Sequence, residues 1–335
     1  MWINLWEALR GRWTGLRESL SKAIMVYYSI STIVLHRRNW PMLKRLAAVC
    51  TFLLVFTNAA SAQLQVLTTI KPLQLIAAEL MDGVVVPELL IPSNVSPHHF
   101  TLRPSDIRSM TDARLVVWVG PQMETYLADF VTQLDARTNV IEMAALEGVL
   151  LHGPGGESEY AEHDRYDPHV WLNINNARLL AERMAQALID LDPSNQQRYQ
   201  ANLSRFTASV GTLETQMSDE VERLQAGRYA VYHDGLQYFE KQFGLVHQFV
   251  LVPDHEIQPG IRHILEVRSR LQELRPTCLL EDVNSNDSTT ETVFGDYPIN
   301  RVRVDTLGDA ITSGPGSYAQ LIGNLAQAIN TCLGQ

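Results

Sequence analysis

The sequence predicts an α/β protein with two parallel-sheet lobes that one long helix joins. Short β-rich runs alternate with helical stretches in both halves of the chain, which is the pattern of parallel strands with helical crossovers. One stretch with the apolar spacing of a helix, and without a strand pattern, separates the two halves. The 335 residues are 46% hydrophobic, which is enough for one large or two medium domains with substantial cores.

The same alternation defines each lobe. In the first half, β-rich and helical stretches occur at 64–70, 73–81, 84–91, 113–120, 139–143 and 177–191. In the second half, β-rich runs occur at 228–233, 246–252, 277–283 and 300–305. We therefore expect an N-terminal lobe at 63–192 and a C-terminal lobe at 228–335.

Residues 193–227 are expected to form the joining helix, from the turn at Asp192 and Pro193 to the break near Gly227. At about 1.5 Å per residue it would run roughly 45 to 50 Å, enough to cross between the lobes. A long helix is stiffer than flexible strands, so we expect only small lobe motions on ligand binding. The apolar positions of its buried face step by three and four: Leu203, Phe206, Val210, Leu213, Met217, Val221 and Leu224.

The N-terminal part has the features of an export signal. In residues 42–62, Lys44 and Arg45 precede an apolar stretch that ends in Ala60, Ser61 and Ala62, an A-x-A cleavage site. This predicts a signal peptide and a mature chain that begins near Gln63. We interpret residues 1–41 as a gene-model extension ahead of a true start at Met42. The alternative is a long n-region or an interfacial anchor.

The charge balance argues against some partners. Beyond Ala62 the chain has 19 basic and 35 acidic residues, a net charge of −16. Nucleic acid and anionic membrane surfaces attract basic proteins, so neither is expected to be a partner.

Three cysteines occur in the chain. Cys50 lies inside the apolar part of the signal, which leaves Cys278 and Cys332 in the exported protein. Two cysteines in an exported chain suggest one disulfide that pins the C-terminal tail. A lipoprotein role for Cys50 is disfavoured because Val49 is larger than the small residue that such a site prefers.

Four residues are candidate metal ligands. His98 follows one predicted strand, and His233 and Asp305 each end another, where open α/β sheets bind ligands. His169 is the fourth candidate. Each histidine alone is more often an ordinary strand-end side chain than a ligand, and the spacing between the four has no local signature.

Residues 151–168 have many glycines and acids but no apolar period, which predicts an exposed loop. His152 and His163 in this loop form a weak second metal site in one interpretation. In the other, which we favour, the loop is solvated and flexible.

Five strings carry a resemblance to a known family: SPHHFTLRPSD (96–106), VVWVGPQME (116–124), DPHVWLN (167–173), YHDGLQYFEKQFGL (232–245) and EIQPG (256–260). Together they resemble the periplasmic zinc-binding proteins of zinc-uptake ABC transporters, the ZnuA type of the cluster A-I metal solute-binding family. The resemblance runs from about Gln63 to the C-terminus. It implies two α/β lobes joined by a backbone helix, and a Cys278–Cys332 disulfide.

The resemblance implies that His98, His169 and His233 bind the metal. Close zinc-specific relatives have an acid where this chain has Pro97, and His99 competes with His98 for the first position. Asp305 matches the aspartate that completes the site in manganese-type relatives. The fourth ligand is therefore expected to be Asp305, with three alternatives: water, Glu281 and Asp282. For the two acids, a strand end facing solvent is the preferred interpretation.

The function implied is a monomeric, periplasmic, high-affinity zinc receptor that delivers Zn²⁺ to an inner-membrane ABC permease. Three imidazoles and one oxygen suit zinc, and manganese receptors of this family carry a carboxylate where this chain has His233. Asp234 and Asp167 are candidate acceptors for the imidazole N–H groups, or ordinary surface acids. Zinc should be released near pH ~5.

Two other functions remain as alternatives. The first is a manganese receptor or adhesin of the same fold. The second is a zinc hydrolase, which is disfavoured because the chain has His255 and Glu256 followed by Pro259 in place of an HExxH motif.

Overall fold

The computed structural model describes residues 64–153, 166–224, 227–252, 260–283, 285–295 and 297–334. The expected extension at 1–41, the signal segment at 42–62, His163 and the residues around Glu256 lie outside this part of the chain. In the described helices, none is both long and apolar enough to cross a membrane.

The N-terminal lobe is built on a parallel four-stranded sheet with the order β2-β1-β3-β4. Its strands are β1 (Val66–Thr68), β2 (Glu88–Leu89), β3 (Leu115–Trp118) and β4 (Asn139–Glu142). β1 and β3 are buried along their whole length, as expected of central parallel strands. The helices are α3 (Lys71–Leu80), α4 (Pro104–Asp112), α5 (Ala128–Val131) and α6 (Ile174–Leu191), with short 3₁₀ turns η1 (Thr125–Leu127), η2 (Met143–Ala145) and η4 (Val170–Leu172).

The C-terminal lobe has a parallel three-stranded sheet with the order β5-β6-β7. Its strands are β5 (Tyr229–Val231), β6 (Cys278–Asp282) and β7 (Asn300–Val304). Its helices are α8 (Gln237–Phe243), α9 (Ile261–Leu274), α10 (Asp287–Phe294) and α11 (Ser317–Leu333). The two parallel α/β sheets confirm the predicted fold class.

The strand predicted at 246–252 is not a full strand. The segment runs beside β5, where Leu251 N donates to Val231 O at 2.9 Å, but it makes only one isolated bridge, between Val231 and Val250. Phe249, Leu251 and Val252 are buried. The β-rich composition of this segment therefore results from its burial at the edge of the sheet. The segment does not form a regular strand.

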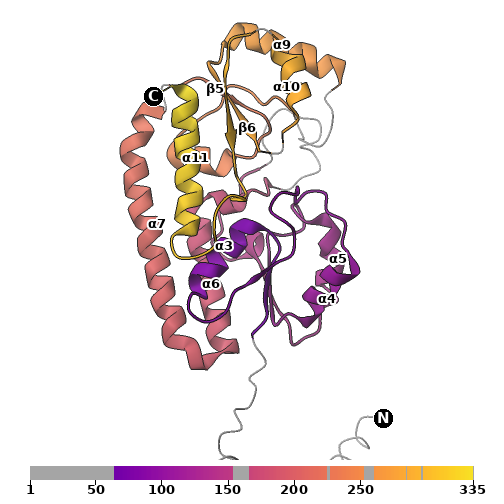
Figure 1. Ribbon diagram of the computed structural model, residues 1–335, viewed down its shortest axis with the longest axis vertical. Coiled ribbons are helices and arrows are strands. Elements are labelled where there is room, and N and C mark those ends of the chain that lie inside the picture. Colours follow the sequence, from indigo (N-terminus) through magenta and orange to yellow (C-terminus); the bar gives the residue numbers. More distant parts are fainter. Residues whose placement is uncertain are drawn as a thin grey trace, which may run out of the picture. The chain divides into compact units, whose positions relative to one another are not determined.

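The long helix between the sheets is α7 (Gln196–Leu224), which follows the 3₁₀ turn η5 (Pro193–Asn195). Its 29 residues make it about 44 Å long at ~1.5 Å per residue. α7 packs against α3 and α6 of the N-terminal lobe and against α8 and α11 of the C-terminal lobe. Figure 1 shows α11 beside the upper part of α7, which extends well beyond it.

A second connection between the lobes, through α3 and α11, was not foreseen. Glu79 on α3 is buried, and its carboxylate accepts hydrogen bonds from Gly316 N and Tyr318 N at the start of α11, both at 2.9 Å. Backbone N–H groups at a helix start lack partners in the helix, so this carboxylate caps α11 from the other lobe. One hydrophobic core contains buried side chains of both lobes, and a second, smaller core lies within the C-terminal lobe.

Cys278 at the start of β6 and Cys332 near the end of α11 form the expected disulfide, with Cα atoms 5.3 Å apart. It closes a sequence separation of 54 residues, for which chain entropy gives about 4 kcal/mol of stabilisation. We expect the Cys278→Ala, Cys332→Ala variant to lose roughly 2 to 5 kcal/mol of unfolding free energy in urea titrations. Reductant should destabilise the wild type but not this variant. An unchanged denaturation midpoint in the variant would contradict the assignment.

Candidate metal centre

One cavity of about 50 Å³ brings together residues of both lobes, and we call it the histidine cavity. About 10 to 15 Å³ of such space is enough to hold a water molecule, so the cavity has room for a metal ion together with water. All four predicted ligands line it. The lining residues are Ser96, Pro97, His98, His169, Trp171, His233, Asp282, Val283, Val304, Asp305, Thr306 and Leu307.

His169 is held at the start of η4 by a buried carboxylate. Its Nδ1 lies 2.7 Å from Asp167 Oδ1, which also accepts the His169 backbone N–H at 2.9 Å. Both residues are almost fully buried, at 6% and 4% exposure. The carboxylate favours a proton on Nδ1 and leaves the Nε2 lone pair for a ligand. The prediction that Asp167 serves this imidazole agrees with the geometry.

His233 follows β5 and is held in the same way, but by a different acid from the one expected. Its Nδ1 lies 2.5 Å from Asp282 Oδ2 at the end of β6. Asp234 does not take this role, and its buried Oδ1 has no hydrogen-bond partner among the described residues. Consecutive residues leave a strand end in different directions, whereas the parallel pairing of β5 with β6 brings Asp282 to the same edge as His233.

The pKa of His233 is raised above its ordinary value. Burial alone would lower this pKa, but the charge and hydrogen bond of Asp282, with the charges of Asp234 and Asp167, outweigh it. The surroundings of His233 therefore favour a positive charge at this point.

The Nε2 atoms of His169 and His233 face each other at 3.4 Å. With both Nδ1 atoms on carboxylates, each Nε2 presents a lone pair toward the other. Two lone pairs at this distance repel each other unless a proton or a cation lies between them. The pair is therefore arranged to share a positively charged ligand.

His98 and His99 are separated by the structure. His98 lines the cavity with its ring 5.4 Å from that of His169, whereas His99 is exposed and is not among the lining residues. In the described part of the chain, no three His, Cys, Asp or Glu side chains are already placed to hold a metal ion. His169 and His233 approach each other through their Nε2 atoms, and the His98 ring lies beside that of His169.

Asp305 also lines the cavity, just after β7. Its Oδ1 accepts from Gly308 N at 2.7 Å and its Oδ2 from Ala310 N at 3.2 Å. Each carboxylate oxygen retains a second lone pair after these bonds, so Asp305 is oriented by the turn and still able to bind a cation.

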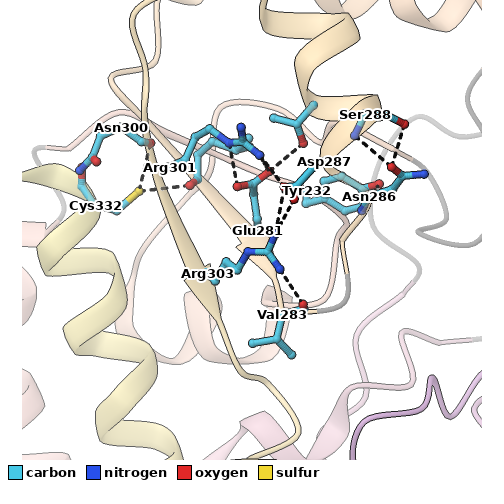
Figure 2. A network of polar contacts seen from close by, with 12 residues as sticks. Tyr232, Glu281, Val283, Asn286, Asp287, Ser288, Asn300, Arg301, Arg303 and Cys332 are labelled. Carbon is cyan, nitrogen blue, oxygen red and sulfur yellow. Dashed lines mark hydrogen bonds and ion pairs between the residues drawn. The ribbon is translucent and has the colours of Figure 1, made fainter.

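The preferred interpretation of Glu281 and Asp282 as solvent-facing acids is wrong. Glu281 is 2% exposed and accepts hydrogen bonds from Arg301 at 2.9 Å and from Thr290 Oγ1 at 2.7 Å, so its charge is paired away from the cavity. Figure 2 shows this network, in which Arg303 also donates to Val283 O at 2.9 Å. Both neighbours of Asp282 are thus held by β7, which fixes the acid that binds His233.

Gly235 is a functional candidate that the sequence analysis missed. A Cβ atom built on it would lie 2.6 Å from Nε2 of His233 and 3.4 Å from Nε2 of His169. The absent side chain therefore leaves open the space onto which both lone pairs face. The only signal in the sequence was the HDG string at 233–235.

The described ends of the 151–168 loop are exposed at Leu151 and Gly153, as expected, but some of their residues are packed. His152 is half-buried, its ring lies 4.8 Å from that of Tyr238, and its backbone N–H donates to Tyr238 Oη at 3.1 Å. At the other end Asp167 is buried under His169.

A two-lobed α/β fold with a cavity of histidines and carboxylates defines a solute-binding receptor for metal ions. Residues 66–332 match the family described as zinc-uptake complex component A, periplasmic (ZnuA), and the chain belongs to this family.

The chain is also similar to individual proteins of this kind. The chain is 30% identical over 321 residues to the high-affinity zinc uptake system protein ZnuA of Yersinia pestis, covering 90% of this chain and 100% of the relative. A crystal structure of ZnuA has the same fold, with a TM-score of 0.69 and 20% identity over 81% of this chain and 99% of that one. A manganese-bound periplasmic metal-binding protein from Candidatus Liberibacter asiaticus is also similar, with a TM-score of 0.65 and 18% identity over 80% and 98%.

Proposed function

We propose that the protein is a high-affinity zinc receptor of the periplasm that delivers Zn²⁺ to an ABC transporter permease. One observation carries the proposal: the Nε2 atoms of His169 and His233 are 3.4 Å apart. Two nitrogens bound to a tetrahedral zinc at ~2.0 to 2.1 Å are about 3.3 to 3.4 Å apart. The spacing is therefore that of two neighbouring zinc ligands.

His98 supplies the third nitrogen in this proposal, and Asp305 or a water supplies the fourth ligand. Both side chains line the same cavity as the imidazole pair. His98 reaches the metal by side-chain rotation from its position 5.4 Å from the His169 ring. Asp305 is held by two backbone amides and binds the metal in that orientation. The core that both lobes share through α3, α7 and α11 limits any accompanying lobe motion.

The ligand set favours zinc over manganese. Three imidazoles with at most one carboxylate are typical of zinc, whereas Mn²⁺ prefers carboxylate, carbonyl and water oxygens. The nearby carboxylates of Asp167 and Asp282 are engaged with the Nδ1 atoms, so they tune the imidazoles instead of binding the metal.

A metal titration tests the function. Purified protein should bind one zinc tightly, manganese should not displace it, and a His98→Ala, His169→Ala, His233→Ala triple variant should lose this binding. Tight zinc that survives in the triple variant moves the site elsewhere. Tight manganese without zinc supports the manganese receptor instead.

Zinc affinity is expected to fall steeply between about pH 8 and about pH 5. Protons compete with zinc for each Nε2, and the raised pKa of His233 means that this competition begins above the ordinary histidine range. Affinity is therefore full above that pKa and is lost as the pH falls through it. Competitive zinc titrations at several pH values measure this, and a flat profile would rule out the histidine site.

The remaining parts of the proposal concern the exported protein. Residues 42–62 act as the signal peptide. The N-terminal lobe spans 63–192, the joining helix 193–227 and the C-terminal lobe 228–335. The receptor acts as a monomer and has no enzymatic activity. Mass spectrometry of the mature N-terminus tests the first point. A peptide from residues 1–41 in the exported protein contradicts the assignment of Met42 as the start.

A further inference from the structure

Tyr126 contacts the segment that carries His98 on both sides of this histidine. Its hydroxyl donates a hydrogen bond to Pro97 O at 3.0 Å, directly before His98. Its ring lies 6.1 Å from the ring of Phe100, within the range of packed aromatic pairs. One side chain therefore holds the chain immediately before and shortly after the proposed ligand.

Tyr126 itself is tied firmly to the N-terminal sheet. It lies in η1 (Thr125–Leu127), which follows Glu124 directly, and the Glu124 backbone carbonyl accepts from Leu127 N at 2.9 Å. Glu124 is fully buried and accepts hydrogen bonds from Thr69 Oγ1 at 2.5 Å and from Gly120 N at 3.0 Å. Both donors lie just beyond the carboxyl ends of strands β1 and β3. Tyr126 thus connects the N-terminal sheet to the segment that carries His98.

This contact is important because His98 lies in a stretch of bends without helix or strand. The Pro97 carbonyl belongs to the peptide unit that enters His98, so the hydrogen bond fixes the orientation of that unit and with it the direction of the imidazole. Pro97 is buried, so its carbonyl would lose a partner that water does not readily replace.

We propose that Tyr126 is a positioning residue for His98, which keeps this imidazole directed into the histidine cavity through the bond to the Pro97 carbonyl. The inference rests on the proposed zinc site. It predicts that the hydroxyl of Tyr126 contributes to zinc affinity only through His98.

A double-mutant cycle of Tyr126→Phe with His98→Ala tests this. Phenylalanine keeps the ring contact with Phe100 and removes only the hydroxyl. We expect Tyr126→Phe to weaken zinc binding roughly two- to tenfold, the effect of one hydrogen bond, and to have no further effect in the His98→Ala background. Tyr126→Leu, which also removes the ring, should weaken binding more than Tyr126→Phe.

The matched control is Tyr199→Phe. Tyr199 is also buried, and its hydroxyl donates to Asp192 Oδ2 at 3.0 Å between α6 and α7, away from the residues that line the cavity. This variant should bind zinc like the wild type.

The outcomes separate the inference from the function on which it rests. Wild-type affinity in Tyr126→Phe, or an equal loss with and without His98, overturns the positioning role while the zinc site stands. Wild-type affinity in His98→Ala overturns the role of His98 in the proposed site, and the inference with it. Melting temperatures of the metal-free variants identify any loss that comes from unfolding.

Discussion

Gly235→Ala should abolish tight zinc binding while leaving the metal-free protein folded. The added methyl group would lie 2.6 Å from Nε2 and Cε1 of His233, closer than real Cβ contacts, and 3.4 Å from Nε2 of His169. Either the methyl group occupies the metal position or His233 rotates away from Asp282. Both outcomes remove a ligand, so we expect an affinity loss above about 100-fold, or about 2.7 kcal/mol.

Gly211→Ala is the control for this experiment. Gly211 lies in the middle of α7, where an added Cβ would meet only Arg178 Nη2 at 3.9 Å, an ordinary contact. Alanine also favours the helix at this position. Normal zinc binding by Gly211→Ala with wild-type affinity in Gly235→Ala would show that the space beside Gly235 is not the metal position.

His169→Ala should also lose more than about 100-fold in zinc affinity. His169 is the central imidazole, with its ring 5.4 Å from His98 and 5.3 Å from His233. Removal of a carboxylate that hydrogen-bonds to a metal-binding histidine typically weakens metal binding 10- to 100-fold. Asp167→Asn therefore gives the reference loss of zinc affinity with which the loss in His169→Ala is compared. Competitive titration of both variants gives the comparison.

His263→Ala is the corresponding control among the histidines of the chain. His263 lies on α9, where its Nε2 contacts Leu251 O at 2.8 Å and not the cavity. Its removal should leave zinc affinity unchanged. If His169→Ala binds zinc as well as His263→Ala does, then His169 is not a ligand.

The fold was largely predictable because its signals are local. Strand runs, the three- and four-residue steps of α7, and the disulfide of Cys278 with Cys332 each depend on neighbouring residues or on a single pairing. The segment at 246–252 misled because burial at a sheet edge produces the same apolar composition as a strand. The cap of α11 by Glu79 was not predictable, because 237 residues separate Glu79 from Gly316.

The candidate site was predictable as a set of residues but not as a set of contacts. Strand-end positions and the family strings pointed to His98, His169, His233 and Asp305, which line one cavity. The choice of Asp282 over Asp234 depends on the register between β5 and β6, which no string in the sequence reveals. The role of Gly235 depends on the two imidazoles meeting across the lobes.

The most direct test of the zinc site is anomalous diffraction at the zinc edge from crystals grown with one equivalent of zinc. We predict one strong peak at ~2.0 to 2.2 Å from Nε2 of His169 and of His233, with a His98 nitrogen and one oxygen completing a tetrahedron. A single strong peak elsewhere, with the His169 and His233 pair unchanged at 3.4 Å and no metal between them, would contradict the account.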